Sequence, residues 1–125
     1  MNNRIEIFVK DGISIAQVLD DGISINNTQD TLDLIADCNY NFNGTYKIIL
    51  NEEQINPDFF DLKTGIAGEV LQKFSNYRCQ LAIVGDFTKF NSKSLTDFIM
   101  ESNKSGNIFF VENLEEATKR LMINN

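Results

Sequence analysis

The chain has 125 residues, of which 42 % are hydrophobic, and carries a formal net charge of −7. This length and composition predict one folded domain with a single core, spanning residues 1–125. Nucleic acids and anionic membrane surfaces both attract basic patches, so the acidic charge argues against either as a partner. The sequence has no histidine and no Cys-x-x-Cys pair, which excludes zinc fingers, Ser–His and Cys–His catalytic pairs, and histidine-based acid–base catalysis.

Two cysteines, Cys38 and Cys79, occur within apolar stretches (LIADCNY and YRCQLAIV). We interpret both as buried structural thiols rather than as a disulfide or a reactive site. The N-terminal sequence MNNRIEIFVK has no long apolar run, and no other segment approaches the length of a membrane span. We therefore expect a cytoplasmic protein, and no motif indicates a metal or a cofactor.

The chain opens with a predicted β-hairpin. Residues 4–9 alternate apolar and polar side chains, and Asp11-Gly12 is a strong turn signal that leads into a partner strand at 13–19. The pentapeptide DGISI recurs at 21–25, which indicates a second turn and a short extension rather than a solenoid repeat.

A first helix and a buried strand follow. Asn27 or Thr28 can cap the helix, and Gly44 lies in the loop beyond it. Residues 46–50 (YKIIL) form a continuous apolar run, as expected of a strand that is covered on both faces. The predicted inner face of the helix consists of Leu32, Ile35, Ala36 and Asn39.

The second half of the chain repeats the pattern of buried strand and amphipathic helix. Residues 80–84 (QLAIV) predict a strand that ends at Gly85-Asp86. Ser92 caps the next helix, and Gly106 ends it. The inner face of this helix consists of Leu95, Phe98, Ile99 and Ser102.

A last strand at 108–111 (IFFV) places Phe109 and Phe110 on opposite faces, both in the core rather than in a ligand-stacking surface. Asn113 and Glu116 resemble a capping box that opens a final helix. The predicted order is ββαβαβαβα, an α/β fold with right-handed crossovers and a mainly parallel sheet, to which the N-terminal hairpin adds one antiparallel strand at or near an edge. The inner face of the final helix consists of Leu114, Ala117 and Leu121.

The segment DLKTGIAG at 61–68 places two glycines near the start of the second predicted helix. Asn56-Pro57-Asp58 is a possible helix start, but both glycines would then lie inside the helix at about 1 kcal/mol each relative to alanine. We therefore favour an irregular turn at 57–62 and a helix that begins near Lys63 or Thr64. The free amides of that helix would form an anion-receptive N-terminus.

Two roles for this segment stay open. Gly65, Ala67 and Gly68 could let the helix approach a neighbouring element closely, or the segment could form a binding or modifiable site. A nucleotide P-loop is excluded, because Gly-x-x-x-x-Gly-Lys-Ser/Thr is absent. Thr64 is the possible phospho-acceptor. The candidate ligand- or partner-binding residues are Asp61, Lys63, Thr64, Gly65 and Gly68.

A second candidate is the segment VGDFTKFNSKSL at 84–95, which follows a buried strand and leads into a helix. Ligands of open α/β sheets bind at this end of the strands, so a phosphate or carboxylate could dock there. The alternative is structural: an Asx turn at Asp86, a Ser92 cap and solvated lysines. Because both segments follow parallel strands, one crevice could use both. The candidate residues here are Asp86, Lys89, Ser92 and Lys93.

Four carboxylates are possible acids or metal ligands: Asp61, Glu69, Asp86 and Glu101. No Asp-x-Asp run or EF-hand spacing supports a metal site. We expect most of these acids to be solvated or to pair with Lys63, Lys73 or Arg78.

Several motifs carry a resemblance to a known family. They are FFDLKTGIAGEVLQKFSNYR at 59–78, LAIVGDF at 81–87, ESNK at 101–104 and QDTLDLIAD at 29–37. In these motifs the chain resembles the bacterial "domain of unknown function 4180" (DUF4180) proteins over nearly the whole domain. Cys38, Cys79 and Thr96 depart from the residues expected of that family. As the family's name says, the resemblance implies no activity.

The predicted element order is also similar to that of STAS domains, the anti-sigma-factor antagonists typified by SpoIIAA. In those domains a serine or threonine at the start of the second helix is phosphorylated by a partner kinase, which breaks a protein–protein contact. Thr64-Gly65-Ile66 falls at the corresponding place, so the resemblance implies Thr64 as the hydroxyl. Leu62 and Lys63 stand where that family has Asp and Ser, and the preceding loop NEEQINPDFF is longer.

Two hypotheses follow. The first is a non-enzymatic, STAS-like regulatory or scaffolding module that binds a protein partner through the start of the second helix. A homodimer that forms through the sheet edge or an exposed apolar helix face is compatible with this hypothesis and with the next. The second is a binder of a small anionic ligand (a nucleotide or phosphorylated metabolite), or a minor enzyme, with its site between Thr64 and Lys93.

Overall fold

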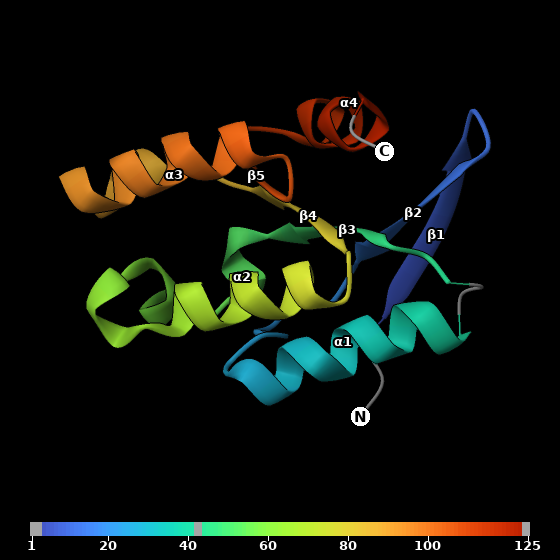
Figure 1. Cartoon of the computed structure of the whole chain (residues 1–125), viewed down its shortest axis with the longest axis horizontal. Coiled ribbons are helices and arrows are strands. Elements are labelled where there is room, and N and C mark those ends of the chain that lie inside the picture. The colour runs from blue at the N-terminus through green and yellow to red at the C-terminus, as the bar shows by residue number, and fades with distance from the viewer. Residues whose placement is uncertain (1–3, 42–43, 124–125) are drawn as a thin grey trace.

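The computed structural model describes residues 4–41 and 44–123 (Figure 1). Within these residues one five-stranded sheet follows the order of the sequence. β1 is antiparallel to β2 at the edge, and the other neighbouring strands are parallel. The predicted α/β fold, with a mainly parallel sheet and an N-terminal hairpin at its edge, is confirmed. The strands are β1 (Ile5–Lys10), β2 (Ile13–Val18), β3 (Lys47–Asn51), β4 (Gln80–Val84) and β5 (Ile108–Val111).

The core clusters divide the helices unequally between the two faces of the sheet. They are α1 (Thr28–Asn41), α2 (Ile66–Asn76), α3 (Lys93–Ser105) and α4 (Leu114–Ile123). Because parallel crossovers are right-handed and the strand order follows the chain, the three helices that connect parallel strands must share one face. Accordingly α1, α2 and α3 bury Leu34, Phe74 and Leu95 in one core cluster. The last helix, α4, buries Ala117 and Leu121 on the opposite face.

The two copies of DGISI form different turns. Asp11 and Gly12 have positive φ angles of 52° and 79°, which suit the tight turn between β1 and β2. In the second copy the chain bends at residues 21–22, and Ile25 then makes an isolated parallel bridge with Ile55. The predicted second turn and short extension are therefore confirmed.

The buried face of α1 differs from the predicted one. Asn27 caps the helix, since its side-chain oxygen accepts a hydrogen bond from the amide of Asp30 at 2.9 Å. Ala36 is exposed, so its placement on the inner face was wrong. A polar residue, Thr31, begins the buried face, because its hydroxyl donates to the carbonyl of Asn27 at 3.4 Å within the helix. The buried face consists of Thr31, Leu34, Ile35 and Cys38.

The C-terminal elements follow the prediction except at one residue. Phe109 and Phe110 lie in the core clusters on opposite faces of the sheet. The side chain of Asn113 caps α4 by accepting a hydrogen bond from the amide of Glu116 at 2.8 Å. Leu114 is 43 % exposed, contrary to the prediction, because it is the first residue of α4 and precedes the turns that pack on the sheet.

Three 3₁₀ turns lead from β3 into α2: η1 (Glu52–Gln54), η2 (Pro57–Phe60) and η3 (Leu62–Thr64). The irregular segment predicted at 57–62 is therefore confirmed, although α2 begins at Ile66, slightly later than expected. Gly65, with a φ of 78°, forms the left-handed link between η3 and α2. In the described ranges, every helix is too short or too polar to span a bilayer.

Both cysteines are free thiols buried in the core, as predicted. Burial raises the pKa of Cys38 to about 12 and the pKa of Cys79 to about 11. Because the thiolate is the reactive form, both side chains are inert at neutral pH.

Candidate functional site

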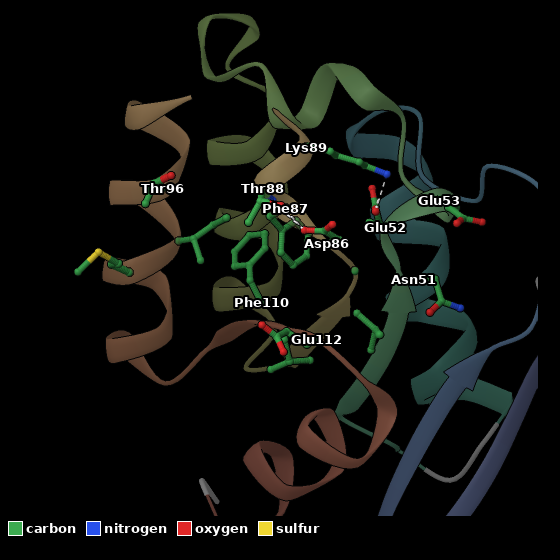
Figure 2. A pocket seen from close by; sticks show the side chains of 15 residues that line it. Asn51, Glu52, Glu53, Asp86, Phe87, Thr88, Lys89, Thr96, Phe110 and Glu112 are labelled. Carbon is green, nitrogen blue, oxygen red and sulfur yellow. Dashed lines mark hydrogen bonds and ion pairs between the residues drawn. The ribbon is translucent and has the colours of Figure 1, made fainter. Parts of the chain in front are cut away.

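A cleft opens at the carboxyl ends of β3, β4 and β5. The chain leaves β4 toward α3 on one face of the sheet and leaves β5 toward α4 on the other, so the two connections diverge. Ligands of open α/β sheets bind at such a divergence. The cleft has a volume of about 1170 Å³ and is lined by residues 51–53, 84–89 and 110–112 and by one side of α3 (Figure 2).

Glu52, the first residue after β3, is a nearly buried carboxylate in the wall of this cleft. It is 8 % exposed, and its Oε1 lies 2.6 Å from Nζ of Lys89. Lys89 belongs to the 3₁₀ turn η4 (Phe87–Phe90), which follows β4. The hydrogen bond to Glu52 raises the pKa of Lys89, so the ammonium stays charged. Figure 2 shows this ion pair spanning the cleft wall.

The inner wall of the cleft is aromatic. The ring centroids of Phe87 and Phe110 lie 5.2 Å apart with their planes at 83°, a favourable edge-to-face geometry. Phe60 of η2 stacks on Phe90 with centroids 4.6 Å apart, and its ring lies 5.8 Å from that of Phe87. The turn before α2 is therefore packed against the wall of the cleft.

The cleft is strongly acidic. Among the residues that the structure describes, four carboxylates and one ammonium line it, and the carboxylates of Glu53, Asp86 and Glu112 lie on exposed residues of its rim. Like charges gathered around one cleft add to the same negative potential, so the cleft favours a cation and disfavours an anion. The charged groups are Glu52, Glu53, Asp86 and Glu112, opposed by Lys89.

Asp86 forms the Asx turn that the sequence suggested. Its Oδ1 accepts hydrogen bonds from the hydroxyl of Thr88 at 2.6 Å and from the amide of Thr88 at 3.1 Å. These hydrogen bonds, the hydroxyl's first, hold the pKa of Asp86 below its ordinary value. Asp86 thus has a structural role and also lines the cleft.

Two other residues predicted in this segment lie outside the cleft lining. The side chain of Ser92 caps α3 by accepting a hydrogen bond from the amide of Leu95 at 3.2 Å. The ammonium of Lys93 lies 3.1 Å from the carboxylate of Asp97 in an exposed pair one helical turn apart. Of the predicted set, Asp86 and Lys89 both line the cleft, whereas Ser92 and Lys93 make their contacts with residues of α3.

The start of α2 lies apart from the cleft. Residues 61–68 do not contribute to its lining, so the expected single crevice is not shared by the two segments. The side chain of Phe60 lies between them, packed on Phe87 and Phe90. All five residues predicted at this segment are exposed: Asp61, Lys63, Thr64, Gly65 and Gly68.

The glycines at 65 and 68 do not allow close packing. A Cβ added at either position would meet no atom within 4 Å, so the packing role suggested for them is wrong. Gly65 is required instead by its positive φ. The buried residue between them is Ala67, which is 2 % exposed.

The hydroxyl of Thr64 joins three elements. Its Oγ1 lies 2.8 Å from the carbonyl oxygen of Asp58 in η2 and 2.9 Å from that of Asp61, and it donates to them. It also accepts a hydrogen bond from the amide of Ile66, the first residue of α2, at 3.3 Å. The Asp61 carboxylate meanwhile accepts the amide of Lys63 at 3.2 Å.

The remaining acidic candidates are separate from one another. Glu69 accepts a hydrogen bond from the hydroxyl of Thr28 at 3.0 Å, and Glu101 is exposed on α3. In the described part of the chain, no group of three Cys, Asp or Glu side chains could hold a metal ion. Of the two alternatives predicted for these acids, pairing with Lys63, Lys73 or Arg78 is not found among the described residues, where the ion pairs are Lys89–Glu52 and Lys93–Asp97. All four acids are exposed, in agreement with the solvated alternative.

Sequence reasoning missed the parts of the cleft that follow β3 and β5. Asn51, Glu52 and Glu53 come directly after β3, and Glu112 comes directly after β5. A signal was present, because polar residues that follow buried parallel strands gather at one edge of the sheet. The NEE sequence was interpreted instead as the beginning of a long loop.

The chain belongs to the family described as "Domain of unknown function (DUF4180)", whose sequence profile matches residues 10–121. No curated protein matches the chain in sequence. Among solved structures, it is similar to a "putative anti-sigma factor antagonist" from Thermotoga maritima, with 13 % identity, 94 % of each chain covered and a TM-score of 0.47. A likeness at this level implies no function. The family resemblance seen in the sequence is confirmed.

Proposed function

We propose that this member of the DUF4180 family is a non-enzymatic regulatory module that binds a protein partner, or a second copy of itself, through the start of α2. The observation that carries the proposal is the position of Thr64. Its side chain is exposed, yet its hydroxyl holds η2, η3 and α2 together. One accessible group therefore determines the shape of an exposed surface.

Modification of Thr64 would change that surface. A phosphate adds a charge of about −1.5 to −2 and removes the hydroxyl hydrogen that Thr64 donates. The carboxylates of Asp58, Asp61 and Glu69 belong to the same turns and to the first turn of α2 and would repel the added charge, whereas the Lys63 ammonium and the free amides of α2 would attract it. We infer that a phosphorylated Thr64 would release the turns and alter partner binding. Asp61, Lys63, Gly65 and Gly68 complete the proposed contact surface.

The test is the association state of the purified chain and its co-purified partners, measured by native mass spectrometry. Thr64→Glu is expected to keep the fold and to weaken or abolish an association seen with the wild type. Ser75→Glu is the matched control, because it adds the same charge at an exposed position near the other end of α2. An association that is unchanged in Thr64→Glu, or equally changed in Ser75→Glu, contradicts the proposal.

The alternative function, a small anionic-ligand site or a minor enzyme between Thr64 and Lys93, gains no support from the site. Ser92 and Lys93 have partners within α3, and the nearby cleft carries an excess of carboxylates. Thermal-shift measurements with nucleotides and phosphorylated metabolites distinguish the two functions. A saturable stabilisation that Lys93→Ala abolishes would favour the alternative.

A further inference from the structure

We infer that the cleft at the carboxyl ends of β3, β4 and β5 is a docking site for a basic segment of a partner protein. In the bound state an arginine or lysine side chain of that segment takes the place of Lys89 beside Glu52. The inference concerns the cleft alone and does not depend on the proposed role of Thr64.

The first argument is charge complementarity. The exposed carboxylates of Glu53, Asp86 and Glu112 surround the cleft, and Glu52 lies inside it. Lys89 pairs with Glu52 and neutralises the charge of that carboxylate. The remaining charge, in a chain whose net charge is −7, attracts a cationic segment and raises its association rate.

The second argument is the nature of the ion pair. A carboxylate as buried as Glu52 requires a cationic partner. Lys89 supplies that partner from a side chain that is 50 % exposed, whereas the side chain of Glu52 is 9 % exposed. The Lys89 ammonium can therefore return to water at little cost when another cation arrives. A guanidinium would replace it well, because its planar donors can bind both carboxylate oxygens.

The third argument is the size and composition of the cleft. Its volume of about 1170 Å³ exceeds the roughly 300–1,000 Å³ of most small-molecule pockets. Part of the lining is apolar and includes Ile99, Phe110 and Met100, of which Met100 is 54 % exposed. A peptide segment that carries a cationic residue with apolar neighbours would satisfy the acidic rim and this wall together. Such a segment fits the cleft better than a free metabolite does.

The experiment is selection from a random peptide library displayed on phage, with the immobilised full chain as the target. Selected peptides are synthesised, and their dissociation constants are measured by fluorescence anisotropy. We expect enrichment of arginine or lysine flanked by apolar residues. Enrichment of acidic or uncharged peptides, or no enrichment, overturns the inference.

Cleft variants test the position of binding. Glu112→Gln removes an exposed rim charge and is expected to weaken binding of the selected peptides several-fold, while Glu52→Gln weakens it by about tenfold or more. Lys89→Met removes the internal competitor and is expected to tighten binding by about threefold. Lys93→Met, which removes a lysine outside the cleft lining, is the control. Tightening is a result that a purely structural role of Lys89 would not produce. Glu112→Gln changes only an exposed rim residue, so it remains decisive if Glu52→Gln or Lys89→Met folds poorly.

Spermine tests for a free polycation as the occupant. It carries positive charge without the apolar neighbours of a peptide, so it is expected to compete with the selected peptides only weakly. Spermine that binds as tightly as the best peptide overturns the assignment to a protein segment. Peptide affinities that are the same in Glu112→Gln and in Lys89→Met as in the wild type also overturn it.

Discussion

Gly85 lies against the side chain of Glu52, which occupies the space where a side chain at residue 85 would lie. A Cβ at residue 85 would come within 3.0 Å of three side-chain carbons of Glu52. The Glu52 side chain therefore crosses the end of β4 because residue 85 has no side chain. This crossing brings its carboxylate from the end of β3 to Lys89 in η4.

Gly85→Ala is expected to displace Glu52 and break its pair with Lys89. Introducing a methyl group into a packed contact lowers the free energy of unfolding by about 1–3 kcal/mol. Gly68→Ala is the control, because its Cβ would meet no atom within 4 Å; replacing glycine near the start of α2 should stabilise the protein by up to about 1 kcal/mol. Urea unfolding of both variants checks the prediction, and equal stabilities would contradict it.

Thr64→Val is expected to loosen the turns before α2. The substitution keeps the shape of the side chain but removes the hydrogen bonds to Asp58, Asp61 and Ile66. We expect a loss of about 1–2 kcal/mol in the free energy of unfolding. Amide exchange should also become faster at residues 58–66 than elsewhere. Thr64→Ser retains the hydroxyl, so slow exchange should persist in that variant; fast exchange there would assign the effect to the lost methyl group instead.

The fold was predictable because its elements have strong local signals. The runs QLAIV and IFFV, the Ser92 cap and the turn at Gly12 each specify an element through propensity or backbone geometry. Prediction failed for the buried face of α1. Ala36 was placed on that face but is exposed, and the face begins at Thr31. A polar residue whose hydroxyl is satisfied within its own helix gives no hydrophobic signal.

The candidate site was predictable only in part, because it is formed by contacts between distant segments. Asp86 and Lys89 follow a buried strand and were recognised for that reason. Glu52 could not be assigned a partner from the sequence, since Lys89 is 37 positions away and their contact requires β3 and β4 to be neighbours. Gly85 was interpreted as the end of a strand, whereas its lack of a side chain is what admits Glu52.

Ser92→Ala is expected to destabilise α3 without affecting the cleft. Its hydroxyl accepts the amide of Leu95, and loss of such a cap costs about 1 kcal/mol. Ser94→Ala is the control, since Ser94 is the second residue of α3 and is exposed. Thermal unfolding should show a lower midpoint for Ser92→Ala alone. Equal midpoints for the two variants would argue that Ser92 does not act as a cap.

Alkaline pH is expected to destabilise the protein through its buried thiols. Burial raises the pKa of Cys38 from 9.0 to about 12 in the folded chain, whereas the unfolded chain releases this proton at the ordinary value. The stabilisation is therefore complete below pH 9.0 and is lost as the pH rises toward the folded value. Cys79, raised to about 11, and Lys89, also raised, act in the same direction.

Urea unfolding at neutral pH and at about pH 10 measures this loss for the wild type and for Cys38→Ala. The variant is expected to be less stable at neutral pH, because it leaves a small cavity in the core. Its stability should fall less between the two pH values, since one of the titrating thiols is gone. An equal fall in both proteins would mean that Cys38 is accessible to water in the folded chain and titrates there as it does in the unfolded chain.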